Sequence, residues 1–298
     1  MKEFIVPIQA AVFREARVNV YAYRLDLMHP EVGGNKYFKL KYNLEQARIL
    51  GKTTLLTFGG AYSNHIWATA SAGKMAGFKT IGIIRGEENL PLNEVLTHAK
   101  HCGMELEYLD RTSYRKLKDA TETDFWEGKY GGDIYLIPEG GSNAFAVRGC
   151  MEIMQDFPLA WQYVCTPCGT GGTLAGLYEA MDGTDEQQVI GFASLKGGEF
   201  LRDDVKKLLL AHQPKQKKVD LQLPKFNLMT AYHFGGYAKS NNLLKQFIQD
   251  FYLQNNILLD EIYTSKMLFG IYDLASRGYF SHQSTVIALL TQRIRFGG

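Results

Sequence analysis

Residues 54–77 read TLLTFGGAYSNHIWATASAGKMAG, and this stretch carries the pattern on which the fold depends. Its first five residues, 54–58, are apolar or β-branched and predict a buried strand. In residues 63–75, Ile66, Ala70 and Met75 fall near one face, which predicts a helix that ends at Gly77. A strand followed at once by a helix is half of a β–α–β unit.

The same alternation continues along most of the chain. Further strands are predicted at 80–84, 105–109, 134–137, 162–166, 189–194 and 284–290, and helices at 93–102, 113–127, 144–155, 172–181, 200–211, 241–252 and 265–276. Strands separated by helices become neighbours only through crossover connections. The sequence therefore predicts an α/β protein with mostly parallel sheets and helices on both faces.

Length, composition and charge narrow the classes of protein and partner. The 298 residues leave room for two domains of about 150 residues each. With 46% hydrophobic and 21% charged residues and a net charge of +2, the chain is typical of a globular protein without nucleic-acid or membrane partners. No apolar run nears the roughly 18 residues of a membrane span, and no secretory signal is evident. The four cysteines are then expected to be reduced thiols in a cytoplasmic protein.

Two glycine-rich segments are candidates for ligand binding. Residues 59–65 (GGAYSNH) and 168–173 (CGTGGT) each lie between a predicted strand and a helix, where the ligands of parallel sheets bind. Unpaired N–H groups at a helix start can hold an anion, and glycines let the backbone approach a phosphate. The second segment lacks the G-x-G-x-x-G spacing of a dinucleotide site, so a single phosphate fits better. A tight turn without a ligand is the other interpretation.

A third segment supplies a lysine, Gly33-Gly34-Asn35-Lys36, ahead of a helical run. A lone lysine is usually a solvated surface residue. Beside a phosphate-binding loop, however, its amine could form a Schiff base with the aldehyde of a phosphorylated cofactor. The combination makes pyridoxal 5′-phosphate the candidate cofactor and Lys36 its candidate site of attachment.

Two groups of metal-ligand residue types have simpler explanations. Cys165 and Cys168 have C-x-x-C spacing, but no second such pair exists in the chain. His98, His101 and Cys102 could meet on one helical turn, which is more simply the wet face of an amphipathic helix. We therefore predict no metal site.

Five segments in order together resemble the aminocyclopropane-carboxylate deaminase and D-cysteine desulfhydrase family, pyridoxal-phosphate enzymes of the tryptophan-synthase-β fold. These segments are 33–40 (GGNKYFKL), 59–65, 138–143 (PEGGSN), 169–173 and 263–266 (YTSK). The resemblance implies two intertwined three-layer domains, a larger cofactor domain of residues 1–39 plus 142–298 and a smaller domain of residues 40–141. It also suggests a homodimer that acts on a small amino acid.

The resemblance implies roles for particular residues. Lys36 would carry the cofactor, Asn64 would bond its phenolic oxygen, and Ser63 and His65 would contact the substrate. The phosphate would lie on Gly169, Thr170, Gly171, Gly172 and Thr173. Two tyrosines face the substrate in the deaminases, and the matching positions are Tyr237 and Tyr263.

Two departures from the deaminase pattern bear on the reaction. Deaminases true to their name carry a glutamate after the second tyrosine, placed to hold a proton on the pyridine nitrogen; Thr264 stands there, as in the desulfhydrases. Thr291 matches a second threonine of the desulfhydrases, but Leu290 and Gln292-Arg293 replace the histidine and two glycines that surround it. We therefore expect D-cysteine desulfhydrase-type elimination to pyruvate, ammonia and sulfide. The alternatives are deamination of 1-aminocyclopropane-1-carboxylate to 2-oxobutanoate, or a catalytically weak protein that binds pyridoxal phosphate or an amino acid.

Overall fold

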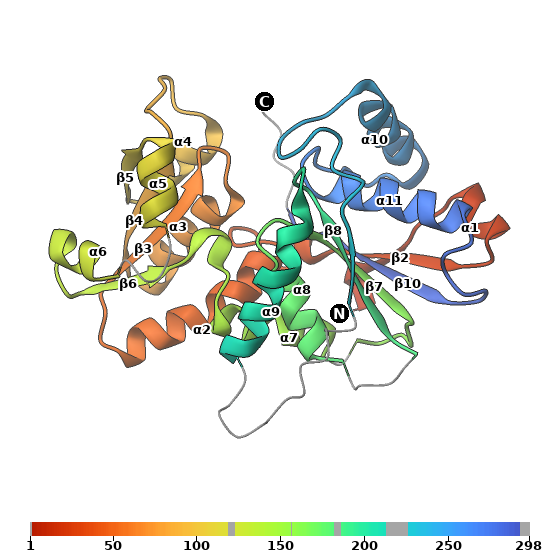
Figure 1. Cartoon of the computed structure of the whole chain (residues 1–298), viewed down its shortest axis with the longest axis horizontal. Coiled ribbons are helices and arrows are strands. Elements are labelled where there is room, and N and C mark those ends of the chain that lie inside the picture. The colour runs from red at the N-terminus through yellow and green to blue at the C-terminus, as the bar shows by residue number, and fades with distance from the viewer. Residues whose placement is uncertain (1, 119–122, 156, 182–185, 213–225, 293–298) are drawn as a thin grey trace.

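A computed structural model describes residues 2–118, 123–155, 157–181, 186–212 and 226–292, and it contains two open sheets (Figure 1). The four-stranded sheet has the order β5-β4-β3-β6 and is parallel throughout. Its strands are β3 (Thr54–Gly60), β4 (Lys79–Arg85), β5 (Met104–Leu109) and β6 (Ile134–Ile137). Residues 54–77 therefore form β3, one of the two inner strands of this sheet, and the helix that follows it.

Helices cover both faces of this sheet. On one face α3 (Asn64–Ala76) and α4 (Glu94–His101) pack through residues such as Ile66 and Leu96. On the other face α5 (Arg111–Leu117) and α6 (Thr123–Tyr130) bury Tyr114 and Trp126 against Phe58 of β3. The sheet is thus the middle of three layers.

The six-stranded sheet has the order β1-β2-β10-β7-β8-β9. Its strands are β1 (Ile5–Pro7), β2 (Asn19–Tyr23), β7 (Tyr163–Cys168), β8 (Gln188–Ala193), β9 (Phe226–Met229) and β10 (Thr285–Leu289). β1 runs antiparallel to β2, and the other strand pairs of the described residues are parallel. The predicted α/β class with mostly parallel sheets is confirmed.

Two separate hydrophobic clusters lie on the faces of the six-stranded sheet. One cluster joins the sheet to α1 (Ala11–Glu15), α10 (Asn242–Asn255) and α11 (Thr264–Ser276), and the other joins it to α7 (Ala144–Met151), α8 (Gly172–Glu179) and α9 (Leu201–His212). α2 (Asn35–Ile49) contacts both α7 and α3 and so connects the two halves of the molecule (Figure 1). Short 3-10 turns are η1 (Lys2–Phe4), η2 (Leu25–Leu27), η4 (Glu139–Gly141), η5 (Glu152–Met154) and η6 (Gly198–Phe200).

The sequence pattern was wrong or silent in a few places. The single helix predicted at 113–127 is wrong, because the chain there forms α5 and α6, and 119–122 lie outside the described residues. The helix predicted at 144–155 ends at Met151 and continues as the turn η5. The three strands β1, β2 and β9 and the short helix α1 were not predicted. No described helix combines the length and apolar composition of a membrane span.

Candidate active site

A cleft of about 860 Å³ opens at the carboxyl ends of strands from both sheets. It is bordered by residues that follow β3, β6, β7 and β10 and by the first turns of α2. Nearly all the predicted site residues line it, namely Lys36, Ser63, Asn64, His65, Gly169, Thr170, Gly171, Thr173, Tyr237, Tyr263 and Thr291. The parallel topology explains this convergence, because the carboxyl ends of parallel strands meet at one edge of a sheet.

Lys36 and Lys39 stand side by side in the cleft, one helical turn apart on α2. The Nζ atom of Lys36 donates to the Gly140 carbonyl oxygen over 3.3 Å, and that of Lys39 donates to the same oxygen over 3.1 Å and to Ser142 Oγ over 2.8 Å. Burial, reinforced by the charge of Lys39, holds the pKa of Lys36 well below its usual range. Burial also lowers the pKa of Lys39. A lysine with a lowered pKa is a better nucleophile at neutral pH because more of it is neutral.

The beginning of α2 is held against the end of the chain's last strand. Gly34 has a φ of +75°, and a Cβ there would come within 1.9 Å of the Thr291 carbonyl oxygen. The same oxygen accepts the Asn35 backbone N–H over 3.2 Å. Only glycine at position 34 therefore lets Lys36 and Thr291 border one cleft.

The glycine loop after β7 forms a cradle that side chains would fill. Gly171 takes a left-handed conformation at the N-terminus of α8, where the first N–H groups lack partners within the helix. A Cβ on Gly172 would lie 2.6 Å from Ser142 Oγ and 3.0 Å from Lys39 Nζ. Thr170 Oγ1 lies 2.6 Å from Ser142 Oγ, so loop, serine and ammonium group form one set of donors. This set suits an anion such as a phosphate.

We expect Gly172→Ala to weaken cofactor binding about tenfold, or about 1.4 kcal/mol, with little loss of fold stability. The new methyl group would displace the ends of two side chains, Lys39 and Ser142, rather than backbone. Equilibrium titration of the apoprotein with pyridoxal phosphate measures the effect. Gly132→Ala is the matched control, since nothing lies within 4 Å of its Cβ position. Unchanged affinity in Gly172→Ala would remove this loop from the phosphate site.

The loop after β3 presents Ser63, Asn64 and His65 at the start of α3. Ser63 caps the helix, and its Oγ accepts the N–H groups of His65 and Ile66. The hydroxyl group of Thr57 donates to the Ile137 carbonyl oxygen, so at the 2.7 Å contact with Thr57 the His65 Nε2 atom must be the donor. Burial, with Lys36 and Lys39 nearby, lowers the pKa of His65 well below its usual range. His65 is therefore neutral, and its buried Nδ1 atom is an acceptor that has no partner among the residues the structure describes.

Tyr237 and Tyr263 meet at the same cleft, with ring centroids 6.0 Å apart. The Tyr263 ring lies against the glycine loop. A Cβ on Gly169 would come within 3.3 Å of the Tyr263 hydroxyl oxygen. Burial first, then Tyr237, raises the pKa of Tyr263 well above its usual range, so its hydroxyl stays protonated.

Lys266 supports the loop that carries Tyr237. This side chain is 1% exposed, and its Nζ donates to the Gly236 carbonyl oxygen over 2.7 Å. Gly235 and Gly236 have φ angles of +94° and +125°, which disfavour other residues. Burial lowers the pKa of Lys266 to about 8, although Asp260 opposes the shift.

The lowered pKa of Lys266 should make stability rise with pH between about 8 and 10.4, because the unfolded chain there binds more protons than the folded one. The resulting increase in the free energy of unfolding is at most about 3 kcal/mol. Urea unfolding of wild type and Lys266→Met at pH 7.5, 9 and 10 isolates it, since the variant should lack this part of the rise. Parallel pH profiles in the two proteins would contradict the assignment.

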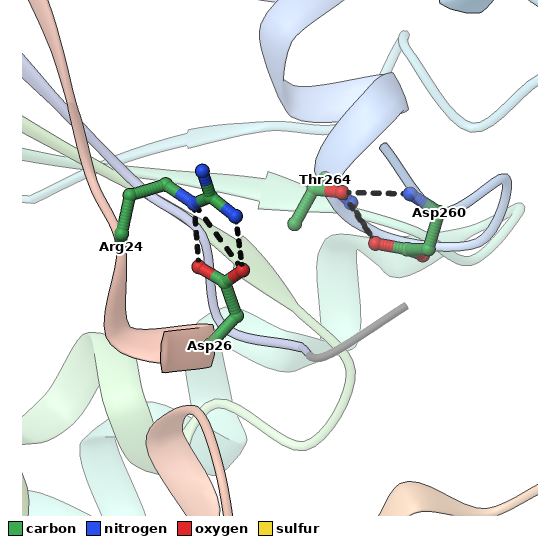
Figure 2. Close-up of polar contacts among 4 residues, drawn as sticks. All are labelled: Arg24, Asp26, Asp260 and Thr264. Atoms are coloured by element: carbon green, nitrogen blue, oxygen red, sulfur yellow. Dashed lines mark hydrogen bonds and ion pairs between the residues drawn. The ribbon is translucent and has the colours of Figure 1, made fainter. Parts of the chain in front are cut away.

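Thr264 is one of two predicted site residues that do not line the cleft. It begins α11 and is 2% exposed, and its hydroxyl donates to Asp260 (Figure 2). Asp260 also accepts the backbone N–H groups of Ile262, Tyr263 and Thr264 and so holds the turn that leads into the helix. The Thr264 hydroxyl is thus already used as a donor. Gly172 likewise is not among the lining residues, although the rest of its loop is.

Arg24 and Asp26 form a partly buried ion pair (Figure 2). The guanidinium group of Arg24 contacts both carboxylate oxygens of Asp26, at 2.9 and 2.8 Å. The Asp26 backbone N–H donates to the Leu290 carbonyl oxygen. This backbone hydrogen bond ties the segment before Gly33 to the residue that follows β10.

Of the cysteine and histidine groups considered as metal ligands, only Cys168 lines the cleft. Cys165 and Cys168 are buried free thiols in β7, and burial raises the pKa of Cys168 to about 12. His98 Nε2 lies 2.7 Å from Ser71 Oγ and 3.3 Å from Cys102 Sγ. Within the described ranges, no three His, Cys, Asp or Glu side chains are grouped so that they could hold a metal ion.

Several cleft residues were not predicted from the sequence. Lys39, Ser142 and Gln292 line the cleft, as do Arg85, Lys118 and Glu139 on its other side. Lys39 could have been predicted from the sequence, because it lies three residues after Lys36 and so on the same face of a helix. The others come from distant segments and become neighbours only through the fold.

The donor set fits pyridoxal phosphate. The cleft volume lies within the range of cofactor sites, roughly 300–1,000 Å³. It offers a lysine with a lowered pKa, a glycine cradle that a Cβ would fill, and two buried polar atoms without partners among the described residues, His65 Nδ1 and Gln292 Oε1.

Comparison with known proteins agrees with this fit. Residues 6–292 match the family described as "Pyridoxal-phosphate dependent enzyme". The chain is 31% identical to the "Putative 1-aminocyclopropane-1-carboxylate deaminase" of Pyrococcus horikoshii, over 90% of this chain and 82% of that protein. It is 24% identical to the D-cysteine desulfhydrase of Yersinia pestis, over 91% and 86%. A solved structure, an ACC deaminase homologue, superposes with a TM-score of 0.79 at 27% identity, covering 97% of this chain and 88% of that one. The chain belongs to the pyridoxal-phosphate dependent enzymes.

Proposed function

We propose that this enzyme deaminates a small amino acid by D-cysteine desulfhydrase-type elimination, giving pyruvate, ammonia and sulfide. The observation that supports this choice is the hydrogen bonding of the Thr264 side chain. The Thr264 hydroxyl donates to Asp260, whose carboxylate also accepts the backbone N–H groups of Ile262, Tyr263 and Thr264. Neither group is free to hold a proton on a pyridine nitrogen, and a weaker electron sink is sufficient for elimination.

The proposal assigns the two lysines different tasks. Lys36 would bond the cofactor aldehyde, while Lys39, already held by Ser142 and Gly140, would face the phosphate with Gly169, Thr170, Gly171, Gly172 and Thr173. Asn64 would bond the phenolic oxygen. When bound, pyridoxal phosphate withdraws electrons from the Cα atom of an amino acid attached to it. Thr264 and Thr291 were expected beside the pyridine nitrogen, and of the two only Thr291 borders the cleft.

Proton movement would again involve Lys36. Its freed Nζ atom, neutral because burial lowers its pKa, would remove the Cα proton of the D-amino acid, after which the bond from Cβ to the thiolate breaks. Ser63 and Asn64 would bind the substrate carboxylate at the start of α3, and His65 would offer the substrate only the acceptor at its Nδ1 atom. Tyr237 and Tyr263 would cover the substrate, and Tyr263 stays protonated as a hydrogen-bond donor. Water completes the reaction, so the activity has both lyase and hydrolase character.

Deamination of 1-aminocyclopropane-1-carboxylate is the second candidate. The relative at 31% identity and the solved homologue both carry that name. The cyclopropane acid has no Cα hydrogen, so Ser63, Tyr237 or Tyr263 would have to deliver a proton or nucleophile to the ring. A third candidate, motivated by Leu290 and Gln292-Arg293, is a catalytically weak binder of the cofactor or an amino acid.

A steady-state assay with both substrates separates these candidates. Pyruvate formed from D-cysteine at a higher kcat/KM than 2-oxobutanoate from the cyclopropane acid is the expected result. The reverse preference would establish the second candidate. A yellow protein that converts neither acid would establish the third.

The organisation of the chain is proposed on the same basis. The larger domain would comprise residues 1–39 plus 142–298 and the smaller domain residues 40–141. Sheet membership supports these bounds, since β3, β4, β5 and β6 lie within 54–137 and the other strands lie outside. A cytoplasmic homodimer completes the proposal, and sedimentation at micromolar concentration tests the dimer.

A further inference from the structure

A second pocket, of about 370 Å³, adjoins the cleft on the face of α5. The walls of this pocket, which we call the basic arm, are Arg85, Arg111, Tyr114, Arg115, Lys118 and Glu139. Arg85, Lys118 and Glu139 also line the main cleft, so the two cavities share a wall.

The basic arm carries an excess of positive charge. Four cations and one carboxylate line it, which leaves a net charge of +3. Glu139 is fully used, because Tyr114 donates to its Oε1 over 2.9 Å and Lys118 to its Oε2 over 3.0 Å. Arg85, Arg111 and Arg115 have no carboxylate partner among the described residues. Arg111 and Arg115 are also four residues apart on one helix, a spacing at which like charges repel.

Arg85 stands where the basic arm meets the substrate loop. It ends β4 and pairs in register with Gly60 of β3. Its Nη2 atom lies 3.5 Å from the position that a Cβ on Gly60 would take, and its guanidinium lies 5.8 Å from the centroid of the Tyr114 ring. The buried Tyr114 thus supports a guanidinium group within the wall that also presents Ser63 and Asn64.

We propose that the basic arm binds a second anionic group at the end of the substrate side chain. This inference rests on the proposed function, in which the amino acid itself lies between Ser63 and the lysines. Guanidinium groups match carboxylate, sulfonate and phosphate oxygens with paired donors. The substrate class is then small acidic D-amino acids that undergo the same elimination. The basic arm would favour them over D-cysteine, whose side chain is neutral.

Binding of unreactive probes to the holoenzyme tests the basic arm. D-Glutamate and D-glutamine have the same shape and differ in charge, and each titration is followed through the absorbance band of the bound cofactor. Wild type should bind D-glutamate at least about tenfold more tightly than D-glutamine. Arg85→Gln should remove most of this preference. Lys116→Gln should keep it, because Lys116 is exposed on the same helix but does not line the arm.

The outcomes separate this inference from the function on which it rests. If D-glutamine and D-alanine shift the band and D-glutamate has no advantage, the basic arm is not an anion site and the proposed function stands. If no amino acid shifts the band, the proposed function fails and the inference fails with it. Sulfate at constant ionic strength should weaken D-glutamate binding but not D-alanine binding. Equal competition with both would place the anion in the main cleft and overturn the proposal.

Discussion

Replacing Lys36 by alanine should abolish the covalent attachment of pyridoxal phosphate and lower kcat/KM at least about a thousandfold. Lys36 and Lys39 both reach the Gly140 carbonyl oxygen, so the structure offers two amines for one aldehyde. Lys39 has a second partner, Ser142 Oγ, and lies against the glycine loop at Gly172. Lys36 has one long contact of 3.3 Å, which is easier to give up. The less restrained amine is the one expected to form the bond.

Borohydride reduction followed by peptide mapping measures this directly. Wild type and Lys39→Ala should both carry the reduced label on Lys36, although Lys39→Ala should bind the cofactor more weakly because a phosphate contact is lost. Lys36→Ala should carry no label at all. A label on Lys39, Lys41 or Lys266 in wild type would make the assignment wrong.

Much of the site could be predicted because local sequence patterns place its parts at the same edge of a sheet. Lys36, Ser63 and Thr170 each lie in a glycine-containing segment near a predicted strand or helix start, and all three line the cleft. Parallel topology brings such segments together without any knowledge of their distances. The α/β class follows from the same alternation, which depends on period and length rather than on contacts.

The basic arm and the Thr264 contact could not be predicted, for a different physical reason. Tyr114 and Glu139 are 25 residues apart and meet only because α5 packs on the four-stranded sheet. An arginine or glutamate in an exposed sequence pattern is normally a solvated surface residue. Thr264 has a local partner in Asp260, yet an aspartate in a turn commonly accepts nearby backbone N–H groups, and the sequence does not show which hydroxyl it will also accept.

That contact changes what should be expected of Thr264→Glu. A glutamate at the start of α11, next to Tyr263, would supply the carboxylate that the deaminases carry after their second tyrosine. Here, however, it would lie beside the Asp260 carboxylate, and two close carboxylates share a proton because they cannot both ionise easily. The single variant Thr264→Glu should therefore change the ratio of kcat/KM for the two substrates only slightly. Asp260→Asn combined with Thr264→Glu leaves one charge and keeps an acceptor for the backbone N–H groups of the turn before α11.

The double variant should raise the ratio of kcat/KM for 1-aminocyclopropane-1-carboxylate over that for D-cysteine at least about tenfold, which is about 1.4 kcal/mol of differential transition-state stabilisation. Ring opening asks more of the electron sink than elimination does, so it gains more from a proton held on the pyridine nitrogen. Asp260→Asn with Thr264→Gln is the matched control, since glutamine has the shape of glutamate without its charge. If the control shifts the ratio equally, the effect is one of shape. If wild type already prefers the cyclopropane acid by a large factor, position 264 does not set the reaction and ring-opening deamination replaces elimination as the function.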